Sequence, residues 1–243
     1  MGFKFKLAPT IATAIVLPIL MSLGFWQLDR AEQKQGRLDL YNIRAKQDAI
    51  NLNRSENLEV KKSDDLLYAM LKVVGRYDDK HSFLIDNKVY KGQVGYHIVT
   101  PFVIKDSDSI VLVNRGWIKG KRYRADLPEF ETPWEEISIK GSGYVPTKNF
   151  FVKDNVKIDT QKFPAVIQTV NFEAIQGIIN KKTYPFVLRL DPDDKTGFVR
   201  DWQIVSSPPE KSHSYAAQWF TMALVVVLIY LSACFNFRRN KKQ

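Results

Sequence analysis

Two long uncharged stretches, one near each end of the chain, constrain the fold more than any other feature of this sequence. No charged residue occurs from Leu7 to Leu28 or from Tyr215 to Phe237. A helix rises about 1.5 Å per residue, so roughly 20 apolar residues cross the ~30 Å hydrocarbon core of a bilayer. The sequence therefore predicts two transmembrane helices. The first ends without a small-residue cleavage site, so we expect a retained anchor rather than a signal peptide.

The distribution of charge predicts the orientation of the two spans. All 26 acidic residues lie between Asp29 and Glu210, and six of the 36 basic residues lie on the short end segments. Basic residues flank membrane helices on the cytoplasmic side, so both termini are expected there and the central segment in the periplasm. No organellar targeting segment is recognisable before the first span, which favours the inner (plasma) membrane of a bacterium over a mitochondrion.

These patterns predict five segments along the chain. They are a cytoplasmic tail (1–6), a transmembrane helix (7–28), a periplasmic domain that begins with a helical stalk (29–212), a second transmembrane helix (213–237) and a basic cytoplasmic tail (238–243). The formal net charge of +10 comes partly from the tails, so nucleic acid is not an expected partner. The only cysteine, Cys234, lies in the second span, so the domain is expected to fold without a disulfide.

The central segment predicts a mainly β domain with one helix. Short runs with a period of two, separated by turn residues, are typical of an antiparallel barrel or sandwich. The expected strands are 71–77, 82–86, 96–104, 110–118, 136–144, 184–190 and 198–204, with a turn at 86–88. Asn171 is a suitable N-cap for a helix from Phe172 to about Asn180, and the helix of the first span is expected to continue to about Ile50.

The residues that could carry chemistry are few. Three histidines and one cysteine, without metal-ligand spacing, give little support to a metal site, and no nucleophile or phosphate-binding motif is recognisable. We therefore do not expect an enzyme. His213 stands out because it opens the second span. Its imidazole could ligate an iron axially, or it could be an interfacial histidine bonded to headgroups or to the domain.

Other polar and aromatic residues are expected at the same level of the membrane as His213. Trp26 ends the first span and Trp219 begins the second, a placement typical of the aromatic belt. Gln27 and Gln218 are expected at that depth and could form a hydrogen bond between the two helices.

Four segments occur in order along the chain and carry a family resemblance. They are Leu23–Arg30 (LGFWQLDR), Gly92–Pro101 (GQVGYHIVTP), Val111–Ile118 (VLVNRGWI) and Tyr215–Phe220 (YAAQWF). Together they resemble the surfeit locus protein 1 family, also called the Shy family, of cytochrome c oxidase assembly factors. The resemblance implies a membrane-held factor, without catalytic turnover, that helps install haem a in subunit I. A transient haem a cargo and contact with haem a synthase are further expectations.

The resemblance also implies site residues. His213 is the expected axial ligand of the haem, with Tyr215, Gln218, Trp219 and Trp26 as its neighbours. Arg115 could hold a haem propionate, or it could be part of a strand and turn next to a core tryptophan, and we favour the structural role.

The histidine at the second span is displaced from the family pattern. The family has it three residues before the tyrosine, where this chain has Ser212, and His213 stands two before Tyr215. One residue turns a helical side chain by about 100°. If the helix is already formed there, His213 faces a different neighbour. If the chain is still entering the helix, a backbone adjustment could turn its side chain to the direction of the family's histidine.

Two alternative functions remain open. The first is a scaffold that holds subunit I or the haem synthase and binds no haem. The second is a membrane-anchored periplasmic enzyme, for which the sequence offers no cluster of acid, base and nucleophile.

Overall fold

The fold is described from a computed structural model of the chain, which describes residues 6–54, 63–146, 158–159 and 162–235. The chain forms two compact units. One contains Met1–Leu40 and Gln203–Gln243, and the other contains Tyr41–Trp202. We refer to them as the helical unit and the β domain.

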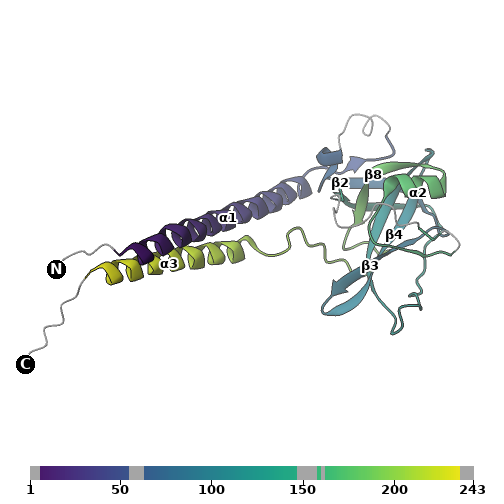
Figure 1. Ribbon diagram of the computed structural model, residues 1–243. Helices are drawn as coiled ribbons and strands as arrows, with labels where there is room; N and C mark the ends of the chain where they lie inside the picture. The colour runs from purple at the N-terminus through teal and green to yellow at the C-terminus, as the bar shows by residue number, and fades with distance from the viewer. Residues whose placement is uncertain (1–5, 55–62, 147–157, 160–161, 236–243) are drawn as a thin grey trace, which may run out of the picture. The chain divides into compact units, whose positions relative to one another are not determined.

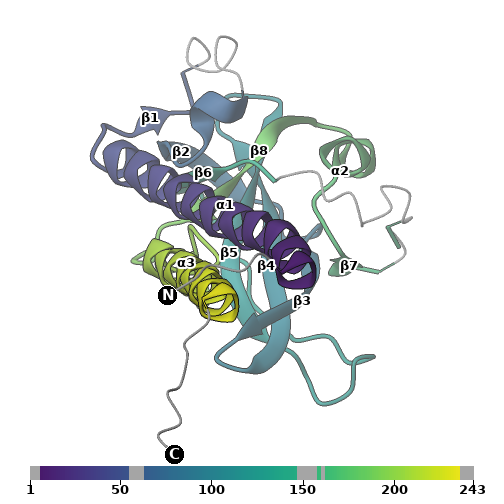
Figure 2. The same ribbon diagram turned by 60° about the vertical axis from the view of Figure 1, so that its left-hand side comes forward.

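The helical unit consists of two antiparallel helices that lie side by side (Figures 1 and 2). Helix α1 runs from Leu7 to Ala45 and helix α3 from Pro209 to Cys234, and both are long and apolar enough to cross a membrane. Helix α1 ends five residues earlier than predicted. The chain turns after Ala45, and Ile50 pairs with Leu71 in a short parallel strand, β1 (Ile50–Asn51).

The β domain is built around a closed five-stranded barrel (Figure 1). Its strands, in order around the barrel, are β2 (Met70–Tyr77), β6 (Ile137–Tyr144), β8 (Lys182–Leu190), β5 (Ser109–Lys119) and β4 (Gln93–Ile104). The pairing of β2 with β4 closes the ring. A β-rich domain between two apolar helices is thus confirmed, and the barrel rather than the sandwich is formed. The predicted antiparallel pattern needs one correction, because β5 and β8 are parallel.

Shorter elements extend the sheet beyond the barrel. Strand β3 (Phe83–Tyr90) pairs with β4, β7 (Ala165–Ile167) pairs with β3, and the 3₁₀ helix η2 (Ser63–Leu66) precedes β2. The predicted turn at 86–88 is wrong. Those residues lie inside β3 at a bulge, and the hairpin turn falls at Lys91 and Gly92, which both have positive φ.

The predicted strand at 198–204 is also wrong. This segment forms only an isolated bridge between Val199 and Trp117. The bridge depends on Gly116, whose φ is +116° and whose position allows Val199 O to approach within 2.6 Å of where a Cβ would stand. Gly116 follows a bulge at Arg115, as the pairing of β4 with β5 skips that residue. Glycine suits this place beside a bulge, because it has no Cβ and adopts positive φ without steric cost.

Alternation along the strands divides the apolar residues between the barrel interior and its outer face. Val111, Val113 and Leu188 point into the barrel, and Leu112 and Val187 point outward. Helix α2 (Phe172–Ile179) covers part of that outer face beside β8 (Figure 2). Its predicted N-cap is confirmed, since Asn171 Oδ1 accepts a hydrogen bond from the Ala174 N–H over 3.0 Å.

Candidate functional site

The two long helices are joined by a lysine beyond their apolar stretches. Lys34 Nζ donates hydrogen bonds to Ser207 Oγ over 2.9 Å and to Ser212 Oγ over 2.8 Å. Ser212 is only 3% exposed, so its hydroxyl faces α1. Hydrogen bonds to a charged group contribute about 1.5–3 kcal/mol, which makes this contact the principal polar link between the two helices. Sequence reasoning missed Lys34, because its partners Ser207 and Ser212 lie 173 and 178 positions away in the chain.

His213 has a different environment from Ser212. Helix α3 begins at Pro209, so it is already helical at both positions and their side chains diverge by about 100°. His213 is exposed, and its ring makes no hydrogen bond to any residue that the structure describes. The sequence left open whether the helix is already formed at His213, and the structure shows that it is. A ring nitrogen of His213 is therefore free to meet a ligand from outside the helix pair.

The structure places His213 nearer the start of α3 than the tryptophan with which it was expected to share a level. In the antiparallel pair Gly24 lies against Phe220, so Trp26 and Trp219 lie at about the same level. His213 is six residues before Trp219, which corresponds to about 9 Å along the helix. Along the helix pair, the two tryptophans thus lie at one level and His213 lies at another.

The remaining predicted site residues on α3 lie on different sides of the helix. Tyr215 and Gln218 are exposed, and Trp219 is half-buried. Trp26 of α1 is 53% exposed, with the Arg30 guanidinium 6.0 Å from its ring centre. Among the described residues Gln218 makes no hydrogen bond to Gln27, so the predicted bond between the helices is not formed.

Close approach of the two helices depends on a glycine. A Cβ built on Gly24 would lie 2.5 Å from Phe220 Cε1, and the Phe25 ring meets Phe220 edge-on at 5.4 Å. Further along the pair, Thr10 Oγ1 donates to the Tyr230 hydroxyl over 3.1 Å. In lipid, the hydrophobic effect does not drive two helices together, so their association depends on close packing. Small residues such as Gly24 allow the helices to approach closely enough for it.

Arg115 is fully engaged within the β domain. It is 2% exposed, and its guanidinium lies 4.9 Å from the ring centres of both Tyr77 and Phe198. It donates to Thr196 O, to Glu131 O and to Thr132 Oγ1, each over 2.8–2.9 Å. Burial lowers the pKa of Arg115 and raises that of Tyr77 to about 12. The contacts support the structural role for Arg115, because its donors are already used by three loop residues.

A second polar cluster lies on the outer face of the barrel. His97 on β4 is half-buried, and its Nδ1 lies 3.4 Å from Asn114 Nδ2. Burial, together with Lys88 and Arg189, lowers the pKa of His97 to about 4, so its ring is neutral at physiological pH. Arg189 on β8 is half-buried as well. Sequence reasoning missed this cluster, because His97, Lys88 and Arg189 come from three different strands.

Neither cluster contains the ligands of a metal site. Within the parts of the chain that the structure describes, no three residues of the types His, Cys, Asp and Glu are grouped to hold a metal ion. The described residues near the start of α3 offer one exposed imidazole, hydroxyl groups, aromatic rings and the cations of Lys34 and Arg30.

Comparison with known proteins finds relatives that match most of the chain. A family model described as the SURF1 family matches residues 14–224. SURF1-like proteins of Rickettsia bellii and Rickettsia felis are 28% and 26% identical, covering 90% and 95% of this chain and 88% and 96% of their own lengths. The cytochrome oxidase assembly protein SHY1 of Saccharomyces cerevisiae is 26% identical over 49% of this chain and 31% of its own length. The match spans both long helices and the β domain, and the chain therefore belongs to the SURF1 family.

Proposed function

We propose that this chain is a membrane-anchored assembly factor for cytochrome c oxidase that helps insert haem a into subunit I. Membership of the SURF1 family, and the similarity to a yeast protein named for cytochrome oxidase assembly, support the assembly role. Haem a is then a cargo that the chain holds briefly, and no catalytic turnover is required. Subunit I, and the haem a synthase that supplies the cargo, are the proposed partners.

The proposed anchors are helices α1 and α3, which cross the inner membrane. The basic end segments argue for cytoplasmic termini and a periplasmic β domain, and both helices have the length and hydropathy that crossing needs. Lys34, Ser207 and Ser212 then lie on the periplasmic side, where a charged ammonium is tolerated. A reporter fused after Gln243 that is active only in the cytoplasm tests this orientation.

The observation that carries the haem proposal is the exposed imidazole of His213 at the start of α3. Its ring has no hydrogen-bond partner among the described residues, so a nitrogen is available as an axial ligand. One turn further along, the same side of the helix carries Ala217, whose small side chain leaves room for a flat ring beside the imidazole. This donor set fits a haem held by one histidine and reached from outside the helix pair.

The chain's own residues then have separate roles. Lys34 and Ser212 hold the two helices together, and this bond keeps the first turns of α3 in a fixed direction. His213 presents its ring nitrogen on the side of α3 that this bond leaves open. Trp26 and Trp219 set the depth of the pair in the membrane, because amphipathic indoles favour the interface. Bound haem would supply the redox iron of the finished oxidase and no chemistry to this chain.

Deletion of the chain from its own bacterium tests the assembly role. We expect subunit I to lose most of its haem a, measured from the reduced-minus-oxidised spectrum of purified oxidase, and a plasmid copy to restore it. Normal haem a content in the deletion strain would contradict the assembly role.

The scaffold alternative makes a different prediction for the same strain. A scaffold that binds no haem would also lower the haem a content, but the protein purified from haem a-producing cells would show no haem absorption. A His213→Ala copy would then restore the oxidase as well as the unaltered copy does.

A further inference from the structure

The loop between β5 and β6 presents a tryptophan to solvent. Trp134 is 75% exposed, more than any other large apolar side chain that the structure describes in the β domain. Its indole N–H has no acceptor among the described residues, whereas Trp117 and Trp202 both donate to carbonyl oxygens of the domain. Tryptophan is a large apolar residue that is enriched at the energetic centres of protein interfaces. Contacts within the domain do not account for a tryptophan at this position.

The exposure of Trp134 is not the result of a loosely held loop. The guanidinium of Arg115, which is 2% exposed, donates to Glu131 O and to Thr132 Oγ1, each over 2.9 Å. Pro133 follows, and its ring fixes the backbone φ immediately before the tryptophan. The indole is therefore presented on a backbone that is already fixed, so a partner would lose little affinity to ordering of the loop.

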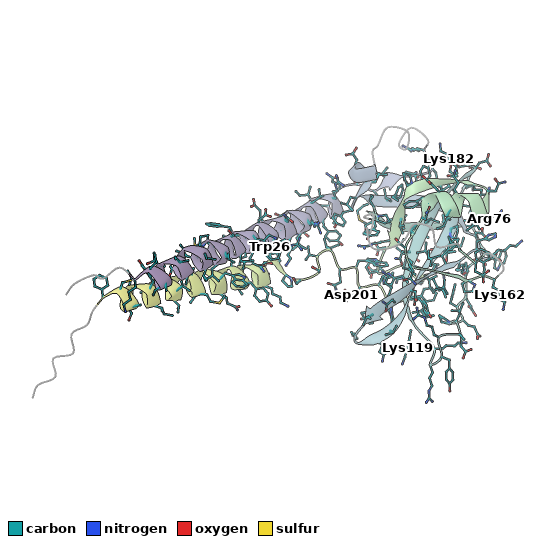
Figure 3. All side chains as sticks on the ribbon, viewed as in Figure 1. Trp26, Arg76, Lys119, Lys162, Lys182 and Asp201 are labelled. Carbon is teal, nitrogen blue, oxygen red and sulfur yellow. The ribbon has the colours of Figure 1, made fainter. Side chains whose placement is uncertain are left out.

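Trp134 lines two open hollows of the domain surface, of about 680 Å³ and about 640 Å³. The charged side chains that line the larger hollow are Arg76, Lys105, Asp106, Asp108, Glu135 and Glu136. Lys105 and Glu136 pair with each other over 2.7 Å. Of the remaining four, three are carboxylates and one is the cation of Arg76, which Figure 3 labels. This hollow is therefore acidic, in a chain whose formal net charge is +10.

The three remaining carboxylates are available to a ligand. Asp106, Asp108 and Glu135 are exposed, and among the described residues none of them forms an ion pair or a hydrogen bond through its side chain. They are not grouped to hold a metal ion, as is true of all residues that the structure describes. An anionic ligand would be repelled, because like charges brought together at an interface are unfavourable. The surface therefore fits an organic cation that lies beside an aromatic ring.

We propose that Trp134 and these three carboxylates form a docking surface for a basic segment of a partner protein. An arginine or lysine of the partner stacks on the exposed face of the indole, which attracts a cation. Neighbouring basic residues of the partner pair with the carboxylates in the hollow. The opposite charges speed association and select a basic partner over an acidic one. This surface lies in the β domain and uses neither haem nor His213, so the inference goes beyond the function proposed above.

Fluorine NMR of the full chain locates the binding. The chain is labelled with 5-fluorotryptophan and purified in a non-ionic detergent, and the Trp134 signal is assigned by its loss in Trp134→Phe. The probe is a synthetic peptide of alternating arginine and glycine. We expect this peptide to shift the Trp134 signal to saturation and to leave the signals of the other four tryptophans in place. The same peptide with citrulline, which has the shape of arginine without its charge, should leave all five in place.

Calorimetric titration with the arginine peptide measures the contribution of the indole. Trp134→Ala should weaken binding by about twofold to fivefold, which is typical of an exposed cation–π contact. Tyr123→Ala is the matched control, because Tyr123 is an aromatic residue of the β domain that is 65% exposed and lines neither hollow. The control should bind the peptide as tightly as the unaltered chain does.

The same titration measures the contribution of the carboxylates. Asp108→Asn/Glu135→Gln should weaken binding by about fivefold, because each exposed ion pair changes an affinity by about twofold to fivefold. Glu173→Gln/Asp193→Asn is the matched control. It removes the same charge from two exposed residues that do not line the hollow, and it should bind as the unaltered chain does.

Four results would overturn the inference. The first is a Trp134 signal that the arginine peptide does not move, and the second is an equal shift with the citrulline peptide. The third is an affinity that Trp134→Ala or Asp108→Asn/Glu135→Gln leaves unchanged. The fourth is a Trp134 signal that moves when the peptide-free chain is diluted, which would assign the surface to a second copy of this chain. The measurements need neither haem nor oxidase, so their failure leaves the assembly role intact.

Discussion

Lys34 Nζ and Ser212 Oγ are joined by a 2.8 Å hydrogen bond between the two long helices, and this bond fixes which side of α3 each of its first residues presents. Ser212 is turned toward α1, and the neighbouring His213 is turned away from that contact. The displaced histidine is therefore on an open side of the helix, whereas the position that the family pattern assigns to histidine is buried in this chain.

Exchanging the two residues tests which side of α3 the haem occupies. The double variant Ser212→His/His213→Ser restores the family spacing but places the imidazole against Lys34. We expect it to lose the haem absorption band, because the new ring is covered by α1 and the open side has no ligand. The spectrum of the purified protein checks this. A band as strong as that of the unaltered chain would contradict the assignment of the open side.

The contact between Gly24 and Phe220 predicts a position-dependent effect of adding a side chain to α1. In Gly24→Val the new side chain would overlap the Phe220 ring, and overpacking typically costs about 1–3 kcal/mol. We expect a lower thermal midpoint for the full chain in non-ionic detergent. Gly36→Val is the matched control, because nothing lies within 4 Å of its built Cβ. Equal midpoints for the two variants would show that the helices are not packed as described.

The buried guanidinium of Arg115 predicts a loss of stability even when its charge is kept. Arg115→Lys cannot reproduce the bonds to Thr196, Glu131 and Thr132, so we expect the free energy of unfolding to fall by about 3 kcal/mol. Urea unfolding followed by tryptophan fluorescence measures it. Arg76→Lys, on exposed β2 surface (Figure 3), should be neutral.

The same variant also separates the two roles considered for Arg115. A structural role predicts that folded Arg115→Lys protein binds as much haem per molecule as the unaltered chain. A haem band that disappears while the domain stays fully folded would instead assign Arg115 to the propionate.

Protonation of His97 predicts how the stability of the β domain depends on pH. The unfolded chain takes up this proton as the pH falls through 6.5, whereas the folded domain stays neutral down to about pH 4. The contribution to stability is therefore complete above pH 6.5 and is lost between pH 6.5 and 4, by about 3 kcal/mol in total. Urea unfolding at pH 7.5, 6, 5 and 4 should show this fall, and His97→Gln should show less of it. Identical profiles would contradict the burial of a neutral His97.

Local patterns predicted most of the elements correctly. Helix α2 followed from Asn171 and the apolar spacing after it, and the barrel strands followed from alternation. The turn at 86–88 and the strand at 198–204 failed for the same reason. Polar residues such as Asp86 and Asn87 occur at a bulge as readily as in a turn, and Val199 pairs with Trp117 only because Gly116 lets it approach.

The site was less predictable because it depends on contacts between distant segments. Sequence identified His213 as the residue of interest. Its direction depends on Lys34 and Ser212, which are separated by 178 positions. The cluster around Arg189 likewise joins strands from both halves of the domain, and periodicity says only that such a residue faces outward.

The absorption spectrum of the full chain, purified from cells that synthesise haem a, tests the central claim most directly. The account predicts a haem band in the unaltered protein, a band lost or strongly weakened in His213→Ala, and a band unchanged in Ser214→Ala, the exposed neighbour on the same helix. A protein without any haem band, or a band of full strength in His213→Ala, would contradict it.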